Sequence, residues 1–309
     1  MLRSFFIALS TNQSFRAFSE RSSLGRQVSR RFVAGVSLDE AIVAAAALNA
    51  DGIQVTLDSL GESVLDIAQA ERSASVYHQL LDAIQAQRLQ ANVSVKLTQV
   101  GMDIGGAVTG PALAERIVGE IVAHAAASGN FVRIDMEGSS YTEPTLALTE
   151  RLHRQYPGAV GTVLQAYLFR TEHDVERLLS QGIRIRLCKG AYKEPAAVAF
   201  PSKSDVDANY VKLMKRVVNS PVFCGIATHD ESIIQQLCAY VADHGIDKRA
   251  FEFQMLYGIR RDLQRKLVEQ GFGVRVYVPF GGEWYPYFMR RLAERPANVL
   301  FLARNLLRR

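Results

Sequence analysis

The residues best suited to chemistry stand near the end of the chain, where Arg290 and Arg291 are adjacent. The sequence predicts a helix from about Trp284, and on it Tyr287 and Glu294 lie three or four residues from both arginines. All four therefore share one flank of the helix. Two planar guanidinium groups directed at one place suit a carboxylate or a phosphate, and Glu294 is placed to orient them. A solvated helix face with ordinary ion pairs is the alternative that this helix alone leaves open.

The elements that must position this helix are eight short runs with the composition of β-strands, each bounded by turn residues. Segments long enough for a helix lie between most of them. This alternation predicts an α/β fold, and the count favours closure into a (β/α)8 barrel. A doubly wound open sheet is the alternative, although no GxGxxG or GxxxxGK[ST] motif occurs. The predicted strands are Ile53–Leu57, Val93–Leu97, Phe131–Asp135, Val160–Ala166, Ile183–Leu187, Val222–Ala227, Phe251–Met255 and Val274–Val278.

The helical segments have recognisable boundaries at several points. Ser37 followed by Glu40 predicts a capping box that opens a helix reaching about Asn49. We therefore expect an N-terminal helical arm over residues 1–50 and a barrel over residues 51–309. The other segments long enough for a helix are Ser63–Arg88, Pro111–Ser128, Thr145–Tyr156, Glu172–Gln181, Asp205–Asn219 and Ile259–Gln270.

The composition is that of an ordinary globular chain of 309 residues, 48% hydrophobic and 22% charged. The net charge is +5 and the pI about 9.1, but the charge is not concentrated into a long basic run, and the chain simply ends in Arg308-Arg309, so nothing points to nucleic acid. Cys188, Cys224 and Cys238 show no CxxC spacing. They read as reduced thiols of a cytoplasmic protein, with neither a disulfide framework nor a metal site.

The two ends of the chain each admit two interpretations. Residues 1–31 are rich in Arg and Ser, as in a mitochondrial transit peptide, but phenylalanines at helical spacing favour structured helices, which we expect. Residues 299–309 combine apolar side chains with Arg304, Arg308 and Arg309. Such a basic amphipathic end suits contact with an anionic membrane surface, and a terminal helix packed on the barrel is the alternative.

Polar and charged residues follow seven of the eight predicted strands, and in a barrel the chemistry lies at the carboxyl ends of the strands. Buried polar groups at this density must be paired with one another or with a ligand. Lys96 is the most demanding, because a lysine in a strand interior needs a carboxylate partner or a functional use. Individually, Asp135 and His229 also read as helix-start residues, and Lys189-Gly190-Ala191 as a turn.

Taken together, these runs resemble a known family. SVKLTQVGMDI, LQAYL, RLCKGAYKEP, ATHD, FEFQMLYGIRRDLQ and YPYFMRRLAERPAN are similar to the motifs of proline dehydrogenases and stand in the same order. The resemblance covers about residues 30 to 305, and the last three runs are highly specific. The chain looks like the monofunctional bacterial form, without the aldehyde-dehydrogenase half of the bifunctional relatives.

This resemblance implies a distorted (β/α)8 barrel with extra N-terminal helices and with its last helix over the barrel mouth. It implies non-covalent FAD across the carboxyl ends of the strands and a site that oxidises L-proline. Asp135 and Arg186 are the implied catalytic residues, with Arg186 near flavin N5 as well as cofactor-binding. The implied substrate-binding residues are Lys96, Leu256, Tyr277, Tyr287, Arg290 and Arg291, with Glu294 behind the arginines. The implied FAD-binding residues are Met136, Gln165, Lys189, Gly190, Ala191, Thr228 and His229.

The expected reaction is hydride transfer from proline C5 to flavin N5, which gives Δ1-pyrroline-5-carboxylate, with a membrane quinone as the electron acceptor. A peripheral contact with the inner face of the cell membrane would accompany it. The alternatives are a Schiff-base aldolase that uses Lys96 or Lys189, a flavin-dependent folate reductase, and a non-catalytic carboxylate-binding protein. The oligomeric state is left open.

Overall fold

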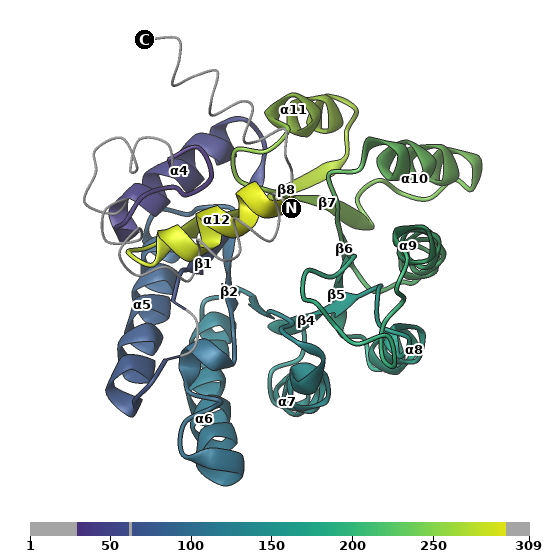
Figure 1. Ribbon diagram of the computed structural model, residues 1–309. Helices are drawn as coiled ribbons and strands as arrows, with labels where there is room; N and C mark the ends of the chain where they lie inside the picture. Colours follow the sequence, from purple (N-terminus) through teal and green to yellow (C-terminus); the bar gives the residue numbers. More distant parts are fainter. Residues whose placement is uncertain (1–29, 62–63, 295–309) are drawn as a thin grey trace.

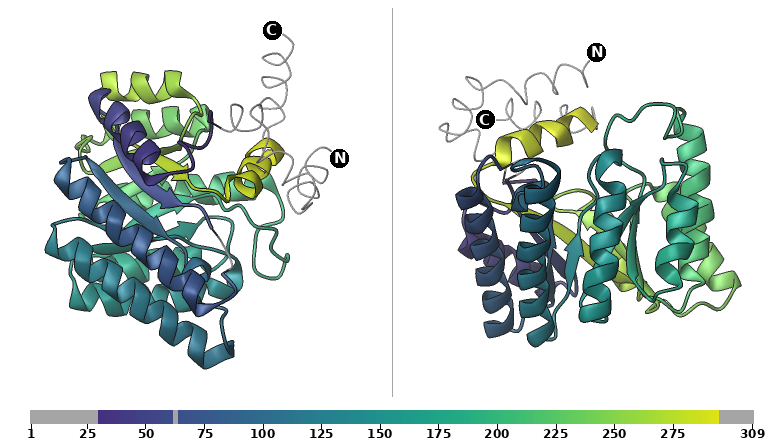
Figure 2. Two further views of the ribbon diagram at one scale, coloured as in Figure 1. Left: turned by 90° about the vertical axis from the view of Figure 1, so that its left-hand side faces the viewer. Right: turned by 90° about the horizontal axis from the view of Figure 1, so that it is seen from below.

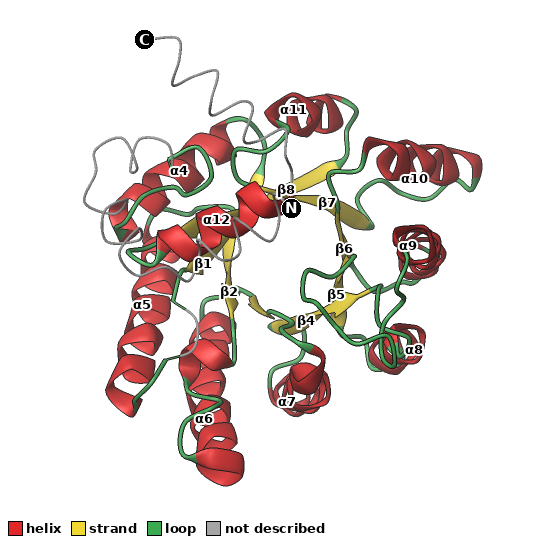
Figure 3. Ribbon diagram, viewed as in Figure 1, coloured by secondary structure: helices red, strands yellow, loops and turns green. Residues whose placement is uncertain are grey.

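The computed structural model describes residues 30–61 and 64–294, with side chains described as far as Met289 in the last helix. Eight parallel strands form a closed barrel in which each strand pairs with the next in sequence and β8 pairs with β1 (Figure 3). This confirms the predicted barrel and excludes the open doubly wound sheet. The strands are β1 Gln54–Ser59, β2 Ala91–Val95, β3 Val132–Ile134, β4 Val160–Gln165, β5 Arg184–Cys188, β6 Cys224–Ala227, β7 Phe251–Leu256 and β8 Gly273–Phe280.

Helices surround the barrel and cover the outward faces of the strands with their apolar sides (Figure 1). One of them, α10 (Glu231–Asp243), is not predicted from the sequence. The helices of the described chain are α4 Leu38–Ala50, α5 Ile67–Ala86, α6 Gly106–Ala127, α7 Thr142–Gln155, α8 Thr171–Leu179, α9 Lys203–Val218, α10 Glu231–Asp243, α11 Arg261–Glu269 and α12 Trp284–Glu294, with short 3-10 turns η1 Thr98–Val100 and η2 Ser139–Tyr141.

Helix α4 takes the place on the outer wall that the helix after β8 would normally occupy. Its N-terminus is the predicted capping box: the Glu40 amide donates to Ser37 Oγ (3.2 Å), and the Ser37 amide donates to the Glu40 carboxylate (3.3 Å). Its buried face, Ala41, Ile42 and Ala45, packs against β1 and β8. With that gap already covered, α12 is not needed on the wall. The proposed division of the chain at residues 50 and 51 stays a prediction.

Helix α12 lies across one end of the barrel, as expected for a last helix over the mouth (Figure 2). The turn into it uses Gly281 at φ +125°, a conformation that favours glycine. The Gly281 amide donates to the carbonyl of Gly35, 3.0 Å away. The helix is held by a buried apolar cluster that includes Leu60, just after β1, and Leu256 packs against this cluster from the end of β7. Its buried members are Phe32, Val33, Leu60, Ile259, Trp284, Tyr285, Tyr287, Phe288 and Met289.

The inside of the barrel is polar. Successive side chains of a strand alternate between its two faces, so Val55 and Leu57 pack outward on β1, whereas Asp58 belongs to the inward set. Two strands carry glycine where a neighbouring side chain is large: a Cβ on Gly225 would lie 2.3 Å from the Gln254 amide nitrogen. The resulting space is filled by hydrogen-bonded side chains that form the floor of the mouth. The inward polar set is Asp58, Ser94, Lys96, Arg133, Asp135, Gln165, Arg186, Glu252, Gln254, Arg275 and Tyr277.

Candidate active site

The predicted site residues whose side chains are described all lie at the carboxyl-terminal end of the barrel or on the helix that crosses it. They fall into two groups. One group comes from β2, β7, β8 and α12, namely Lys96, Leu256, Tyr277 and Tyr287. The other comes from β3 to β6, namely Met136, Gln165, Lys189, Gly190, Ala191, Thr228 and His229. Asp135 and Arg186 pair directly, and the hydroxyl of Tyr277 on β8 donates to Asp135, which joins the two halves of the mouth.

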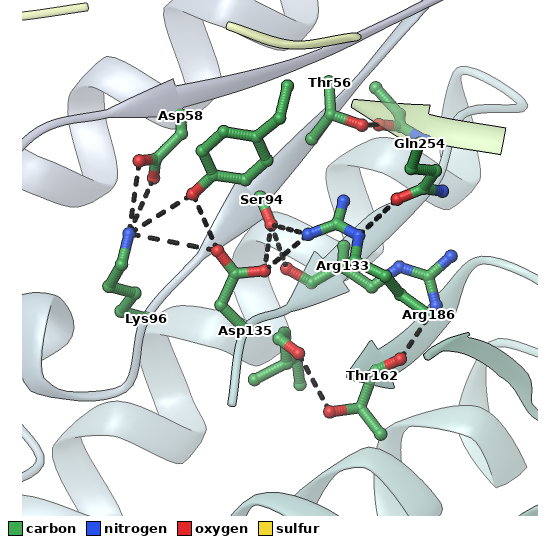
Figure 4. Close-up of polar contacts among 12 residues, drawn as sticks. Thr56, Asp58, Ser94, Lys96, Arg133, Asp135, Thr162, Arg186 and Gln254 are labelled. Atoms are coloured by element: carbon green, nitrogen blue, oxygen red, sulfur yellow. Dashed lines mark hydrogen bonds and ion pairs between the residues drawn. The ribbon is translucent and has the colours of Figure 1, made fainter. Parts of the chain in front are cut away.

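Lys96 forms a close ion pair at the floor of the mouth. Its ammonium lies 3.1 and 3.2 Å from the two carboxylate oxygens of Asp58 and 3.4 Å from the hydroxyl of Tyr277 (Figure 4). The placement of Lys96 in a strand interior was wrong, because β2 ends at Val95 and Lys96 is the next residue. The prediction that it needs a carboxylate partner is confirmed, and the partner is a residue to which the sequence assigned no role.

Asp135 connects several side chains at the floor of the mouth, because both of its carboxylate oxygens accept hydrogen bonds. Oδ1 accepts from Ser94 Oγ (2.6 Å) and from the guanidinium of Arg186 (2.8 Å), and Oδ2 accepts from the hydroxyl of Tyr277 (2.8 Å) (Figure 4). The Arg186 guanidinium also lies over the Tyr277 ring, 5.3 Å from its centre. Burial and the nearby Asp135 charge raise the pKa of Tyr277 well above its usual value, so the phenol stays a proton donor to this carboxylate.

A chain of contacts anchors Arg186 to the deeper part of the barrel. Its Nε donates to the side-chain oxygen of Gln254, whose amide nitrogen donates to Glu252 (2.6 Å). Glu252 in turn pairs with Arg275 at 2.7 Å, and Arg275 donates to the carbonyl of Val55. Three inward residues, Gln254, Glu252 and Arg275, thus support one guanidinium. Glu252 Oε2 has no hydrogen-bond partner in the described structure, but Arg186 itself is held by Gln254 and Asp135 before any ligand binds.

Asp58 makes the stability of the protein dependent on pH. Burial, with a contribution from Asp135, outweighs the attraction of Lys96 and raises the pKa of Asp58 to about 6. The folded state therefore holds this proton more tightly than the unfolded chain, in which the carboxyl ionises near pH 4. The associated stability is fully present below about pH 4 and is lost as the pH rises through about 6.

The measured quantity is the free energy of unfolding of the parent minus that of Asp58→Asn. We expect this difference to fall by about 3 kcal/mol between pH 4 and pH 7 and to stay constant at higher pH. Urea unfolding of both proteins at four pH values between 4 and 8 measures this difference, in which the titration of groups distant from Asp58 cancels. A difference that rises with pH over this range would show that the carboxyl has a lowered pKa.

Among the proposed cofactor-binding residues of the described structure, Gln165 has a buried polar side-chain atom without a hydrogen-bond partner. Gln165, the last residue of β4, is 3% exposed, and its side-chain oxygen has no hydrogen-bond partner in the described structure. Buried acceptors without a partner are rare and costly, so this atom fits a ligand that donates a hydrogen bond. The neighbouring Met136 is also buried.

The loops after β5 and β6 are tied together by charge. Lys189 pairs with Asp207 (2.5 Å) and Asp230 (3.0 Å), and the Asp230 amide donates to Thr228 Oγ1 (3.0 Å). His229 Nε2 accepts from the backbone amide of Leu256 at 2.9 Å, which makes it the unprotonated nitrogen of the ring. The interpretation of these residues as a simple helix start is thus too narrow, because they also join β6 to β7.

Gly190 follows β5 in a conformation that only glycine adopts readily, with φ +115°. A Cβ at this position would lie 2.3 Å from the ring of Tyr167. The glycine therefore lets the loop of residues 189–199 approach the β4 end closely. Glu194 of this loop accepts from the Ser139 amide (2.8 Å), so the loops after β3, β4 and β5 close one side of the mouth.

The structure describes the backbone of the arginine pair. The backbones of Arg290, Arg291 and Glu294 belong to α12, but their side chains lie outside the described residues, so their aim at a common ligand stays a prediction. Tyr287 is buried at the underside of the same helix, in the cluster against which Leu256 packs. The expected helices of residues 1–29 and the basic segment of residues 299–309 also lie outside the described residues.

Comparison with known proteins decides the family. The family model described as Proline dehydrogenase matches residues 41–304. The chain belongs to the proline dehydrogenase family. It is 38% identical to Proline dehydrogenase 1 of Bacillus subtilis subsp. natto over all of both chains, and 43% identical to the Proline dehydrogenase of Deinococcus radiodurans over 91% of this chain and 90% of that one. The predicted resemblance is confirmed, and the protein is an oxidoreductase that acts on proline.

Bifunctional relatives match with lower identity. The bifunctional protein PutA of Escherichia coli is 25% identical over 90% of this chain, which corresponds to 24% of that protein. Among solved structures, a proline utilization A (PutA) from Bdellovibrio bacteriovorus, described as inactivated by N-propargylglycine, superposes with a TM-score of 0.82 at 23% identity. The match covers 95% of this chain and 36% of that one, and it shows the shared fold.

Proposed function

We propose that the protein oxidises L-proline to Δ1-pyrroline-5-carboxylate with FAD and passes the electrons to a quinone. The observation that carries this proposal is the Asp135–Arg186 pair at the floor of the mouth. On one side of it lie a lysine and tyrosine side chains, and on the other lie loop residues and the Gln165 side-chain oxygen, which is buried without a hydrogen-bond partner in the described structure. One half of the mouth thus suits an amino acid with a carboxylate, and the other half suits a large cofactor. A flavin is the group that accepts a hydride, which no protein side chain does.

The cofactor half would hold FAD through eight side chains or backbone positions. Gln165 supplies the unpartnered oxygen, Lys189 a cation beside the phosphates, and Gly190 and Ala191 a backbone that a flat or charged group can approach. Arg186, fixed by Asp135 and Gln254, would face the flavin from the floor. The remaining proposed contacts are Met136, Thr228 and His229.

We expect FAD to be held without a covalent bond. The three cysteines are free, and the thiols of Cys188 and Cys224 have a pKa raised to about 12 by burial, so neither is a ready nucleophile toward the flavin ring. Acid precipitation should release all the yellow colour into the supernatant. Colour that stays with the precipitated protein would show a covalent link and overturn this expectation.

In the substrate half the residues would act at the two ends of proline. Lys96, Arg290 and Arg291 would pair with the carboxylate, and Tyr277 and Tyr287 would enclose the ring with Leu256 beside them. Two charge-assisted contacts from opposite sides leave the ring one orientation, so C5 is held at the cofactor. Holding reacting groups at contact distance accounts for several kcal/mol of a barrier.

The structure argues against the aldolase alternative. A Schiff-base lysine must attack as a neutral amine, but the ammonium of Lys96 is 3.1 Å from Asp58 and that of Lys189 is 2.5 Å from Asp207. Each of these amines is thus already engaged by a carboxylate. A folate reductase on the same fold would require a nicotinamide donor. Its test is whether NADH, added without proline, reduces the bound flavin.

The reaction itself is tested by its product. We expect the purified protein, given L-proline and a soluble quinone, to form Δ1-pyrroline-5-carboxylate, which is captured as its coloured adduct with o-aminobenzaldehyde. The yield should equal the amount of quinone reduced. Proline-dependent quinone reduction without this product would contradict the proposed oxidation at C5.

Access to a membrane quinone is supported by the distribution of exposed apolar side chains. No helix of the described residues is long and apolar enough to cross a bilayer. The large apolar side chains that are exposed in the described chain nevertheless gather at the mouth, in the loops after the strands or in first turns of helices. All except Val43 lie there, namely Val36, Leu65, Ile67, Val108, Phe169, Tyr192 and Val198. We propose that this face, together with residues 299–309, contacts the inner face of the cell membrane from a cytoplasmic protein.

Flotation with anionic liposomes tests this contact. We expect Phe169→Ser/Val198→Ser to reduce the floated fraction, because both side chains are exposed at the mouth (47% and 38%). The matched control is Val43→Ser, since Val43 is 69% exposed but lies mid-helix on α4. A chain that ends before residue 299 separates the contribution of the C-terminal segment. Equal flotation of parent, double variant and shortened chain would remove both surfaces from the proposal.

A further inference from the structure

We infer that Asp58 is a positioning residue that keeps the Lys96 ammonium out of hydrogen-bond distance of Asp135, and thereby leaves Tyr277 in place at the substrate end of the site. This inference rests on the proposed function, because it assigns Lys96 and Tyr277 to substrate binding. Neither composition nor motif spacing pointed to Asp58. Its role follows from the partners of the individual carboxylate oxygens of Asp58 and Asp135.

The four side chains form two close cation–carboxylate pairs, which a longer contact between Lys96 and Asp135 links. Lys96 pairs with both oxygens of Asp58, at 3.1 and 3.2 Å, and Arg186 pairs with Oδ1 of Asp135 at 2.8 Å. The distance from the Lys96 ammonium to Asp135 Oδ2 is longer, 3.9 Å. Each close pair joins one cation to one carboxylate, and Figure 4 shows the two pairs side by side with the longer Lys96–Asp135 contact between them.

Asp135 Oδ2 is the atom for which two donors compete. It accepts from the hydroxyl of Tyr277 at 2.8 Å, and Lys96 is the nearby cation that would replace that hydroxyl. A bare ammonium is attracted to a carboxylate more strongly than a phenol is. The reason that Lys96 does not take Oδ2 is that Asp58 holds it from the other side.

Asp58 suits this task because it is rigid and hidden from water. It lies near the end of β1, next to the strand that carries Tyr277, and its side chain is 1% exposed. A carboxylate in such a place finds no solvent partner, so its attraction for Lys96 is little screened. Lys96 itself is 12% exposed, at the boundary between floor and mouth, where a substrate carboxylate can reach it.

Loss of the Asp58 charge would therefore disturb two substrate contacts at once. In Asp58→Asn the ammonium of Lys96 should move onto Asp135 Oδ2 and displace the Tyr277 hydroxyl. The site would then lose a cation directed at the substrate carboxylate and the fixed tilt of one tyrosine. Without the Lys96 ammonium there is no competitor, so the same change at Asp58 should have little effect.

A double-substitution cycle tests this dependence. The ligand is tetrahydrofuran-2-carboxylate, which has the ring and carboxylate of proline but no oxidisable amine, and its dissociation constant is measured by calorimetry on the FAD-loaded proteins. We expect Asp58→Asn to raise the dissociation constant by about 10- to 100-fold in the parent. In the Lys96→Met background we expect the same change to raise it less than about 3-fold.

Two controls separate positioning from general damage. Asp174→Asn removes another buried carboxylate, 1% exposed and paired with Arg170 at 2.7 Å on α8, and should leave the dissociation constant unchanged. If Asp58→Asn does not fold, Asp58→Ser replaces it in both arms of the cycle. A crystal structure of the Asp58→Asn protein should show Lys96 within hydrogen-bond distance of Asp135 Oδ2.

An equal fold-change in both backgrounds would overturn the inference, since Asp58 would then act independently of Lys96. So would tight, parent-like binding by Asp58→Asn. Either result leaves proline oxidation by the parent untouched, so failure of the inference is distinguishable from failure of the proposed function, which would appear as absence of product from the parent itself.

Discussion

Replacing Arg291 or Arg290 by methionine is expected to lower kcat/KM for proline by about 30-fold to several thousand-fold, with normal FAD content. Each arginine is proposed to make a charge-assisted contact with the substrate carboxylate, and loss of one partner of such a pair costs about 2–5 kcal/mol, at 1.36 kcal/mol per tenfold change in rate. The helix that carries both residues lies over the mouth and is held there by its own apolar cluster, so methionine should leave the fold intact.

The comparison substrate is pyrrolidine, which has the ring but not the carboxylate. It should react poorly and about equally with the parent and both variants, since the arginines have nothing to bind. Arg154→Met, an exposed arginine in the last turn of α7 at the opposite end of the barrel, is the matched control and should keep full activity. An equal fractional loss on both substrates, with lowered thermal stability, would assign the arginines to a structural ion pair with Glu294.

Asp135→Ala is expected to give the largest loss of stability among single substitutions at the site, about 3–5 kcal/mol, and to abolish most proline turnover. The substitution leaves Arg186, which is 7% exposed, as a buried charge without its carboxylate, and breaking one side of a buried pair has this cost. It also releases the hydroxyls of Ser94 and Tyr277. Urea unfolding and steady-state kinetics measure the two effects.

Asp103→Ala serves as the control, because Asp103 also accepts hydrogen bonds from a tyrosine, Tyr141 (2.9 Å), but on the exposed outer surface. It should change the free energy of unfolding by less than about 0.5 kcal/mol. If Asp135→Ala unfolds within about 1 kcal/mol of the parent and keeps its activity, the described floor of the barrel is not what holds Arg186.

The barrel was predictable because each of its strands has a local signature. All eight predicted runs are strands, and their ends differ by three residues or fewer. The predicted helix boundaries were less exact where a residue is compatible with more than one position in a helix. Pro111 was expected to open a helix, as proline does at a first position, but α6 begins at Gly106 and carries Pro111 inside it. A Cβ on Gly110 would lie 2.1 Å from the carbonyl oxygen of Met102, so the glycine in the first turns of α6 lets the preceding loop pack closely on the helix.

The site was predictable in part. The sequence shows which polar residues stand at the strand ends, but it does not show which residues, distant in the chain, they contact. Asp135, Arg186 and Tyr277 were expected at the site, and the structure brings them together. Asp58 was missed because the first strand was predicted to end at Leu57, one residue short of it. Counting every second residue along that strand would have placed its carboxylate inside the barrel.

Other contacts could not be derived from spacing. The pairing of Lys96 with Asp58 joins residues 38 positions apart, and that of Arg186 with Gln254 joins residues 68 apart. Such pairs depend on the register of the closed sheet, which one sequence does not reveal. The side chains of Arg290 and Arg291 lie outside the described residues, so their role depends on experiment.

The measurement that tests the central proposal most directly is anaerobic titration of the purified protein with L-proline, followed by the visible absorption of its flavin. Proline should bleach the flavin band stoichiometrically, and readmission of a quinone should restore it. NADH without proline should leave the band unchanged. A chain that carries no flavin, or whose flavin is bleached by NADH and not by L-proline, would contradict the proposal that this site oxidises proline with FAD.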